Sequence, residues 1–305
     1  MGLQDGRRRV AKSAKTRVIE RIFFQRYDPS QGLADEVVTL DQIASAIAEA
    51  NVEGDQKLSA GNVANFFKDF VRNLTSANAN WPSSVFENGY TGRQETGENA
   101  CFRFMRIADG QTEPFPARIV PAEHVQKVRI ESASMPLAAR RLGRPDETWL
   151  MQVLVRLRVI ETHFCLFSAT GFQQIDHLQT GVKLGRRSEV DAVYLARAGE
   201  LDPGSLICCE AKGLRDDILV DQLIRQVRAM FAQDTSPDSM IPVAAKVVGP
   251  SLVHIVEFHP VLRDVAADLQ VLTIASQAVY EFIPPIPGIG TRSIRSRAVE
   301  RSADE

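Results

Sequence analysis

The sequence predicts a protein of the α/β class, with a three-layer domain around a mixed central β-sheet and a smaller α+β domain before it. Three observations support this prediction. The chain has 305 residues, which is enough for two domains. Its first third contains short amphipathic helical patterns followed by short strand patterns, whereas residues 146–258 follow the order helix, strand, strand, helix, strand, strand. An apolar content of 44% and a charged content of 24% are typical of a folded globular chain.

The chain begins with a basic segment. Residues 1–27 contain eight Lys and Arg residues against two acids, although the whole chain has a net charge of −2. We expect a helix at residues 7–25, with Val10, Val18 and Ile22 among the basic side chains. A segment of this kind suits contact with phosphate groups, and a solvated helix face explains the same pattern equally well.

Two short helices and a pair of strands are predicted next. A capping-box pattern at residues 39–42 opens one helix. Ser59 caps the following helix, whose apolar residues recur at helical spacing over residues 63–74. Strands are expected near Tyr90 and at residues 101–107, on either side of a polar loop.

Helices joined by a turn and followed by strands favour a DNA-binding domain of the winged-helix type. The outward face of the second helix is polar, and Asn and Arg are the side chains that pair with adenine and guanine edges. The candidate DNA-binding residues on this face are Asn62, Asn65, Lys68 and Arg72. The alternative is a solvated polar face that contacts no DNA.

Composition suggests where the domains end. Residues 108–136 are rich in loops and prolines, which indicates a domain junction. After residue 284 the chain is rich in Pro, Gly, Ser and Arg, as expected for a flexible tail. We therefore predict a winged-helix-like recognition domain at residues 1–115, a linker region at 116–145, the α/β domain at 146–283 and a flexible tail at 284–305.

The elements of the α/β domain follow from apolar spacing. Asp146 caps a long helix that runs to about Phe164 and places Glu161 within its apolar stripe. A carboxylate on the core side of a helix requires a compensating partner. The remaining predicted elements are strands at residues 188–197 and 206–212, a helix that starts at 216–217, and buried strands at 241–248 and 252–258.

Acidic residues lie in the middle of the first two of these strands. Residues i and i+2 of a strand share a face, so Glu189 points with Asp191, and Glu210 points with Lys212. Carboxylates are rarely buried in apolar strands without compensation, and clustered carboxylate oxygens suit a divalent cation such as Mg2+. A metal ion beside a lysine suits phosphodiester cleavage. The alternative is a buried salt bridge of Glu210 with Lys212, and of Asp191 with an arginine.

Residues 146–258 resemble the PD-(D/E)XK nuclease superfamily, which includes most type II restriction endonucleases. The resemblance rests on the order of elements and on four side chains, although no proline precedes Asp191 as the family motif would have it. It implies a restriction-endonuclease-like core in which Asp191 and Glu210 bind Mg2+ and Lys212 orients or polarises the attacking water. Glu161 would supply the further catalytic and metal-binding carboxylate that the family often adds from the preceding helix.

Three more side chains are candidates within this resemblance. Glu189 is either an extra metal ligand or a salt-bridge partner of Arg187. Gln222 and Gln226, four residues apart on the next helix, resemble polar residues that some family members place near the scissile phosphate, and so near DNA. Ordinary glutamines on a helix surface are the alternative.

Other chemistries lack their motifs. The chain has no GxxxxGK[ST], no GxGxxG after a strand, no HExxH and no GxSxG, so we expect no nucleotide cofactor, no zinc site and no acyl transfer. Its four cysteines form no CxxC pair, which fits a reducing compartment. No window approaches the ~18 apolar residues that span a bilayer, and no signal-peptide pattern is present. We expect a cytoplasmic protein that does not contact membranes.

Together these patterns predict a Mg2+-dependent endodeoxyribonuclease and, in the most specific form, a type II restriction enzyme that cuts double-stranded DNA. Because one active site cuts one strand, double-strand cleavage favours a homodimer. Two alternatives remain open. One is a nuclease of another role, such as repair, transposition or anti-phage defence, and the other is a non-catalytic winged-helix regulator.

Overall fold

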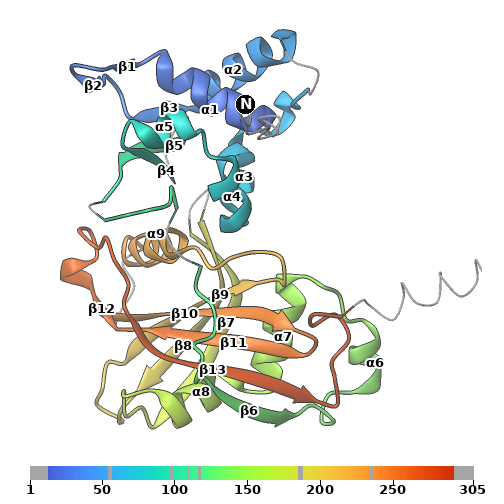
Figure 1. Cartoon of the computed structure of the whole chain (residues 1–305). Coiled ribbons are helices and arrows are strands. Elements are labelled where there is room, and N and C mark those ends of the chain that lie inside the picture. The colour runs from blue at the N-terminus through green and yellow to red at the C-terminus, as the bar shows by residue number, and fades with distance from the viewer. Residues whose placement is uncertain are drawn as a thin grey trace, which may run out of the picture. The chain divides into compact units, whose positions relative to one another are not determined.

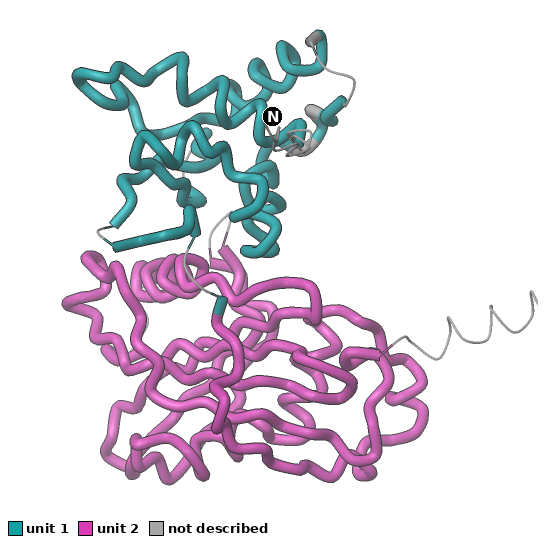
Figure 2. Tube along the Cα trace, in the orientation of Figure 1, with its two compact units in different colours: residues 1–118 teal, residues 119–305 magenta. Residues whose placement is uncertain are grey.

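The computed structural model divides the chain into two compact units, Met1–Arg118 and Ile119–Glu305 (Figure 2). It describes residues 13–53, 57–95, 99–108, 110–115, 118–184, 188–233 and 237–291. Across these residues, no helix has both the length and the apolar character needed to cross a membrane.

The first unit combines short helices with a three-stranded antiparallel sheet in the order β3-β5-β4 (Figure 1). A separate pair, β1 and β2, forms a small antiparallel ribbon. The elements in chain order are α1 (Ala14–Phe24), β1 (Tyr27–Asp28), β2 (Gly32–Leu33), β3 (Val37–Thr39), α2 (Leu40–Glu53), the 3-10 helix η1 (Ala60–Asn65), α3 (Phe66–Val71), α4 (Leu74–Asn80), α5 (Ser83–Glu87), β4 (Tyr90–Gln94) and β5 (Ala100–Arg106).

Side-chain caps explain where the first helices begin. The Gln42 amide donates to Thr39 Oγ1 at 3.3 Å, and the Thr39 amide donates to Gln42 Oε1 at 2.8 Å, so the predicted capping box is confirmed. Ser13 caps α1 by accepting a 3.1 Å hydrogen bond from the Thr16 amide. Residues 7–12 of the predicted first helix lie outside the described residues.

The second predicted helix is divided in the structure. It starts as the 3-10 helix η1, α3 ends at Val71, and Asn73 then caps α4 by accepting a 2.9 Å hydrogen bond from the Ser76 amide. An asparagine side chain competes for backbone amides, which favours a new cap over continuation of the helix. The apolar side chains still form the core, where the Phe67 and Phe102 rings stack 4.6 Å apart. The two strands predicted after these helices are confirmed as β4 and β5.

The second unit is built on a mixed sheet of eight strands among the described residues. Seven lie in the order β6-β13-β11-β10-β9-β8-β7, and β12 pairs with β10. The β6–β13 and β9–β10 pairs are parallel, and the other pairs are antiparallel. The elements are β6 (Gln126–Glu131), α6 (Leu137–Arg141), α7 (Glu147–Arg156), α8 (Val159–Phe167), β7 (Gln174–Leu184), β8 (Ser188–Arg197), β9 (Ser205–Lys212), α9 (Val220–Phe231), β10 (Ser239–Gly249), β11 (Leu252–Phe258), β12 (Val261–Leu262), η2 (Arg263–Val265) and β13 (Ile274–Ile283).

Helices cover both faces of this sheet, and Figure 1 shows α8 and α9 on opposite sides of it. Helices α7 and α8 share a hydrophobic core with alternate strand residues such as Tyr194 and Cys209. Helix α9 packs on the other face with a second core that includes Cys208 and Ala244. Adjacent strand residues therefore face different helices, as the pleat requires. The predicted α/β class with a mixed sheet is confirmed.

The long helix predicted from Asp146 to Phe164 is wrong, because the structure has two helices there. Helix α7 ends at Arg156, and Arg158 has a left-handed backbone (φ 52°) before α8 begins. A left-handed residue other than glycine is uncommon and leaves no mark on the apolar pattern. The apolar stripe of α7 therefore does not continue into α8, and a prediction that assumes one continuous helix gives the wrong orientation for side chains beyond Arg158.

The predicted linker is also corrected. Strand β6 lies inside residues 116–145 and pairs in parallel with β13, so this stretch contributes to the sheet of the second unit. Only Val128 and Ile130 of β6 pack against the core, and the other residues of the strand are exposed and polar. An edge strand with one solvated side is short of apolar residues, which explains why composition alone suggested a linker.

The predicted flexible tail is wrong for residues 284–291. Ile286 and Ile289 are buried in the core, and Trp149 Nε1 donates to the Pro287 carbonyl at 2.9 Å. Glycines allow close backbone contact here, since a Cβ atom added to Gly143 would lie 2.2 Å from the Pro287 carbonyl oxygen. The rest of the predicted tail, residues 292–305, lies outside the described residues.

Candidate functional site

The two acid-bearing strands, β8 and β9, are neighbours in the sheet. They pair antiparallel, and their ladder ends at Ala192 opposite Cys209. The next position along each strand is Asp191 on β8 and Glu210 on β9, one step beyond the last pair of the ladder, and the charge of Glu210 acts on the Asp191 carboxyl. Asp191 Oδ2 accepts a 2.7 Å hydrogen bond from the Ala211 amide, which ties its carboxylate to β9.

Lys212 joins Glu210 on the face of the sheet that α9 covers. Lys212 Nζ donates a close, charge-assisted hydrogen bond to Glu210 Oε1, and their side chains are only 13% and 6% exposed. This contact is also the one that the salt-bridge alternative predicts. That alternative places an arginine beside Asp191, whereas the charged groups that shift the Asp191 pKa are Glu210, Lys212 and Glu147.

Two glutamines of α9 hold the other side of Glu210. Gln222 Nε2 donates to Glu210 Oε1, and Gln226 Nε2 donates to Glu210 Oε2, both at 2.5 Å. Gln226 Nε2 also donates to the Glu189 carbonyl at 2.7 Å, so one amide bridges β8 and β9 where their ladder ends. Gln226 is 2% exposed and its donor is occupied, which corrects its predicted role as a DNA contact. Gln222 is half-buried.

The pKa of Asp191 reflects a carboxyl group that is buried and lies near a second carboxylate. Burial, with the charge of Glu210 and a smaller contribution from Glu147, raises the pKa of Asp191 from 3.8 to about 7. The Ala211 amide and Lys212 act in the opposite direction and do not offset this. At neutral pH the Asp191 carboxyl is therefore poised between its neutral and charged forms.

Glu147 is a carboxylate near this site that the sequence analysis missed. It occupies the first turn of α7, directly after Asp146, whose Oδ1 accepts a 2.8 Å hydrogen bond from the Trp149 amide. A Cβ atom added to Gly213 would lie 3.8 Å from Glu147 Oε1, so this carboxylate reaches the residue that follows Lys212. Acids are common in the first turn of any helix, so the sequence alone gave no reason to select it.

Glu161 does not lie at this site, which corrects the prediction that it is a catalytic residue and metal ligand. Its Oε1 pairs with Arg158 Nε at 3.3 Å, and its charge acts on Tyr194, which faces the α8 side of the sheet. Its other oxygen is buried and has no hydrogen-bond partner among the described residues. The break between α7 and α8 is the physical reason, because Glu161 belongs to the second helix.

Glu189 lies at the margin of the site. Its side chain is exposed and sits beside β7, with Oε1 3.5 Å from a Cβ atom added to Gly181. Its backbone carbonyl, rather than its carboxylate, is connected to Glu210 through Gln226. Arg187, the alternative partner of Glu189, lies outside the described residues.

Metal ligands are few in this arrangement. Among the described residues, no group of three or more His, Cys, Asp or Glu side chains is placed to hold a metal ion. The site instead presents an opposed pair of carboxylates, Asp191 and Glu210, with Glu147 acting from α7. The sequence-based expectation that three acids of β8 and β9 converge on one point is therefore wrong, because Glu189 turns toward β7.

The candidate DNA-binding residues of the first unit lie on η1 and α3. Lys68 and Arg72 are exposed, and Asn65 is half-buried at the start of α3. The side chain of Asn62 lies outside the described residues. The structure thus leaves Lys68 and Arg72 accessible on one short helix and the residue after it.

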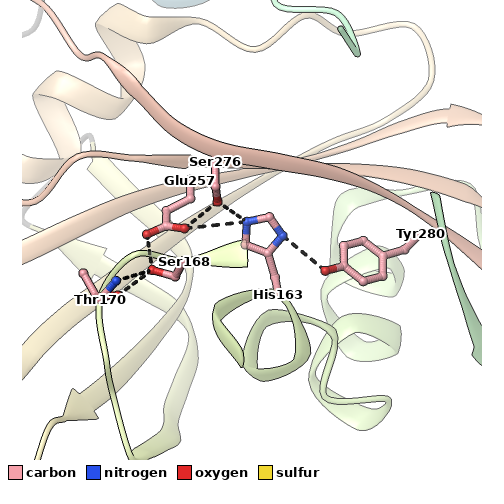
Figure 3. A network of polar contacts seen from close by, with 6 residues as sticks. All are labelled: His163, Ser168, Thr170, Glu257, Ser276 and Tyr280. Atoms are coloured by element: carbon pink, nitrogen blue, oxygen red, sulfur yellow. Dashed lines mark hydrogen bonds and ion pairs between the residues drawn. The ribbon is translucent and has the colours of Figure 1, made fainter. Parts of the chain in front are cut away.

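A second polar cluster lies in the other core of the second unit (Figure 3). Ser276 Oγ donates to Glu257 Oε2 at 2.6 Å and lies 2.9 Å from His163 Nε2, while His163 Nδ1 lies 3.2 Å from the Tyr280 hydroxyl. Burial, with a smaller effect of His254, lowers the pKa of His163 to about 4, so the ring is neutral at pH 7. The Ser276 hydroxyl donates its proton to Glu257, so it accepts a hydrogen bond from His163, and Nε2 carries the proton of the neutral ring. The histidine therefore does not act as a base that activates Ser276 as a nucleophile. This cluster is a structural network.

Comparison with known proteins gives no match: no family model, no curated protein and no solved structure corresponds to this chain. The geometry of the site therefore carries the functional assignment.

Proposed function

We propose that this protein is a Mg2+-dependent endodeoxyribonuclease, with site-specific cleavage of double-stranded DNA, as in type II restriction, as its most specific form. The observation that carries the proposal is the proximity of Asp191 and Glu210 on the neighbouring strands β8 and β9, with Lys212 bonded to Glu210. These are three of the four side chains on which the resemblance to PD-(D/E)XK nucleases rests; the fourth, Glu161, lies elsewhere. The observed order is α7, α8, β7, β8, β9, α9, β10 and β11, which contains the elements of that resemblance with one more strand, β7, before β8.

The residues present fit a magnesium ion. Mg2+ keeps several waters and is usually held in proteins by one or two carboxylates together with substrate phosphates, so it does not need three protein ligands. Burial first, and the charge of Glu210 second, raise the pKa of Asp191, and a divalent cation would offset both effects on its charged form. Asp191 and Glu210 would hold the ion, and Glu147 is placed to act through a water. When bound, the ion supplies positive charge that lowers the pKa of a nearby water and offsets charge developing on the phosphate.

The protein side chains have distinct roles in this proposal. Lys212 holds the attacking water in line with the phosphorus and stays paired with Glu210. Gln222 keeps Glu210 Oε1 directed toward Lys212, because both donate to the same oxygen. Gln226 sets the spacing of the two strands, so it positions the carboxylates without touching substrate.

The first unit supports DNA recognition within the same proposal. In this proposal the order α1, β3, α2, α3, β4 and β5, with β5 between β3 and β4, would correspond to a winged helix, to which the chain adds the β1–β2 ribbon and helices α4 and α5. Lys68 and Arg72 would contact phosphates or bases from the second helix of this motif, with Asn65 beside them. A homodimer would provide one active site for each DNA strand.

Cleavage of a mapped supercoiled plasmid tests the proposal. The full chain should nick or cut DNA with Mg2+ and lose the activity in EDTA, while Asp191→Asn and Lys212→Met should each lower the rate at least about 100-fold. Glu147→Gln should reduce cleavage, and the matched helix variant Glu161→Gln should leave it unchanged. Metal-independent cleavage, or full activity of Asp191→Asn, would remove the basis of the assignment.

The products separate the alternative roles. Discrete fragments indicate restriction, whereas a smear indicates a nuclease without a fixed site. A gel shift without any nicking, even with Mn2+ in place of Mg2+, would favour a DNA-binding regulator.

A further inference from the structure

A buried ion pair lies one strand away from Lys212. Lys246 of β10 is the register partner of Lys212 in the parallel β9–β10 pair, so the two side chains leave the same face of the sheet side by side. Lys246 Nζ donates to Asp217 Oδ1 at 2.6 Å. Lys246 is 4% exposed and Asp217 is 2% exposed, so this contact is shielded from water.

Asp217 belongs to the loop that connects β9 to α9. The loop, residues 213–219, leaves the sheet immediately after Lys212 and enters the helix that carries Gln222. Asp217 is thus five residues beyond Lys212 and five before Gln222, and it is fixed to β10 by Lys246. Ile218 beside it is 2% exposed and packs in the α9 core, which anchors the loop at the same point.

A buried charge pair is an expensive way to anchor a loop, because both groups lose their hydration. Apolar side chains of similar size would fill this space at no such cost. The ion pair has a defined geometry, because a short charge-assisted hydrogen bond holds the Asp217 side chain at one position. Apolar contacts are less directional and would allow the loop to shift along the sheet. Polar specificity of this kind matters most where a loop sets the position of reacting groups.

We propose that the Lys246–Asp217 pair is a positioning device for the candidate active site. By fixing the centre of the 213–219 loop it holds Lys212 and Gln222 on the same oxygen of Glu210, from two different elements. Lys246 and Asp217 act through these residues and do not contact substrate. The expected effect on catalysis rests on the proposed nuclease function, whereas the fixing of the 213–219 loop by the ion pair does not.

The test compares three variants of the full chain. Asp217→Asn/Lys246→Met replaces the ion pair by neutral groups of similar size and avoids leaving one buried charge alone. Lys246→Arg keeps the charge, and Tyr280→Phe removes a buried hydrogen bond on the other face of the sheet, as a control for general destabilisation. Two quantities are measured: amide hydrogen exchange in residues 213–222, and the single-turnover rate of DNA cleavage at saturating Mg2+.

The neutral variant should show faster exchange in residues 213–222, with exchange in β9 and β10 unchanged. Its single-turnover cleavage rate should fall about 10- to 100-fold, because a displacement of about 1 Å is enough for such a loss. Lys246→Arg, which keeps the charge, should retain most of the wild-type cleavage rate, and Tyr280→Phe should cleave at the wild-type rate. Wild-type exchange in the neutral variant, or a similar rate loss in Tyr280→Phe, would overturn the inference. If the wild-type chain cleaves no DNA, the proposed function fails, and hydrogen exchange alone decides the role of the pair.

Discussion

Replacing Asp191 by asparagine should make the protein more stable at neutral and alkaline pH. The folded-state pKa of Asp191 is about 7, raised by burial and by Glu210 from the value of 3.8 that an exposed carboxyl has. Between these two pH values the folded chain holds a proton that the unfolded chain has lost, so the free energy of unfolding falls as pH rises. Asparagine removes the charge and keeps an oxygen that can accept from the Ala211 amide.

The size of the effect follows from the pKa difference. The pKa of Asp191 in the folded chain is about three higher than in the unfolded chain. Because a change of one in pKa corresponds to about 1.4 kcal/mol, the difference amounts to about 4 kcal/mol of unfolding free energy. The asparagine variant should therefore gain nothing below about pH 4, gain progressively between pH 4 and 7, and be about 4 kcal/mol more stable than wild type above pH 7. Bound Mg2+ should reduce this gain, because it compensates the charge in the wild-type protein.

Urea denaturation between pH 4 and 8.5, with EDTA and then with Mg2+, measures this dependence. Asp202→Asn is the matched control in the turn between β8 and β9. Hydrogen bonds from the Ala198 and Gly204 amides lower the pKa of the half-buried Asp202, so this variant should lose stability at neutral pH and approach wild type in acid. A stability difference for Asp191→Asn that does not change with pH would refute the view that burial and the charge of Glu210 raise the pKa of Asp191.

Two further predictions concern packing around the site and around residues 284–291. Gln226→Met should cost about 2–5 kcal/mol of unfolding free energy, because it leaves two buried acceptors without their donor, whereas Gln222→Met should cost about 1 kcal/mol. Calorimetry that shows equal losses would contradict the bridging role of Gln226. Gly143→Ala should destabilise the second unit by about 1–3 kcal/mol, because the added Cβ meets the Pro287 carbonyl. Gly171→Ala, which has open space, should be neutral in the same thermal scan, and an unchanged melting temperature for Gly143→Ala would show that residues 284–291 yield easily.

The sequence predicted the central strands well because their physics is local. Strands β8, β9 and β11 consist mainly of apolar residues, since most of their positions are buried, and the observed bounds agree closely with the predicted ones. The period-2 rule also predicted correctly that Glu210 and Lys212 share a face. The facing of Asp191 and Glu210 needed one more step, the pairing of adjacent strands, and the short β8–β9 connection favoured it.

Other features could not be predicted because they depend on contacts distant in the sequence. Strand β7 is an edge strand in which polar and apolar residues mix, and it was not predicted. Helix continuity was assumed through Arg158, where a left-handed residue changes the direction of the chain and removes Glu161 from the site. Glu147 is recognisable only once Gly213 of another element is beside it. Gln226 looked like a surface residue, because its two partners come from two different strands.

The pairing of β6 with β13 has a consequence for how the second unit is made. Among the described residues β6, the first strand of this sheet along the chain, pairs only with β13, the last one, and the Ser132 hydroxyl donates to the Pro284 carbonyl across 152 positions of chain. During synthesis β6 therefore cannot form its native pairing until β13 has left the ribosome, and until then its backbone amides lack their native partners. Folding dominated by such distant partners is slow, so the sheet should be most vulnerable to misassembly at this edge.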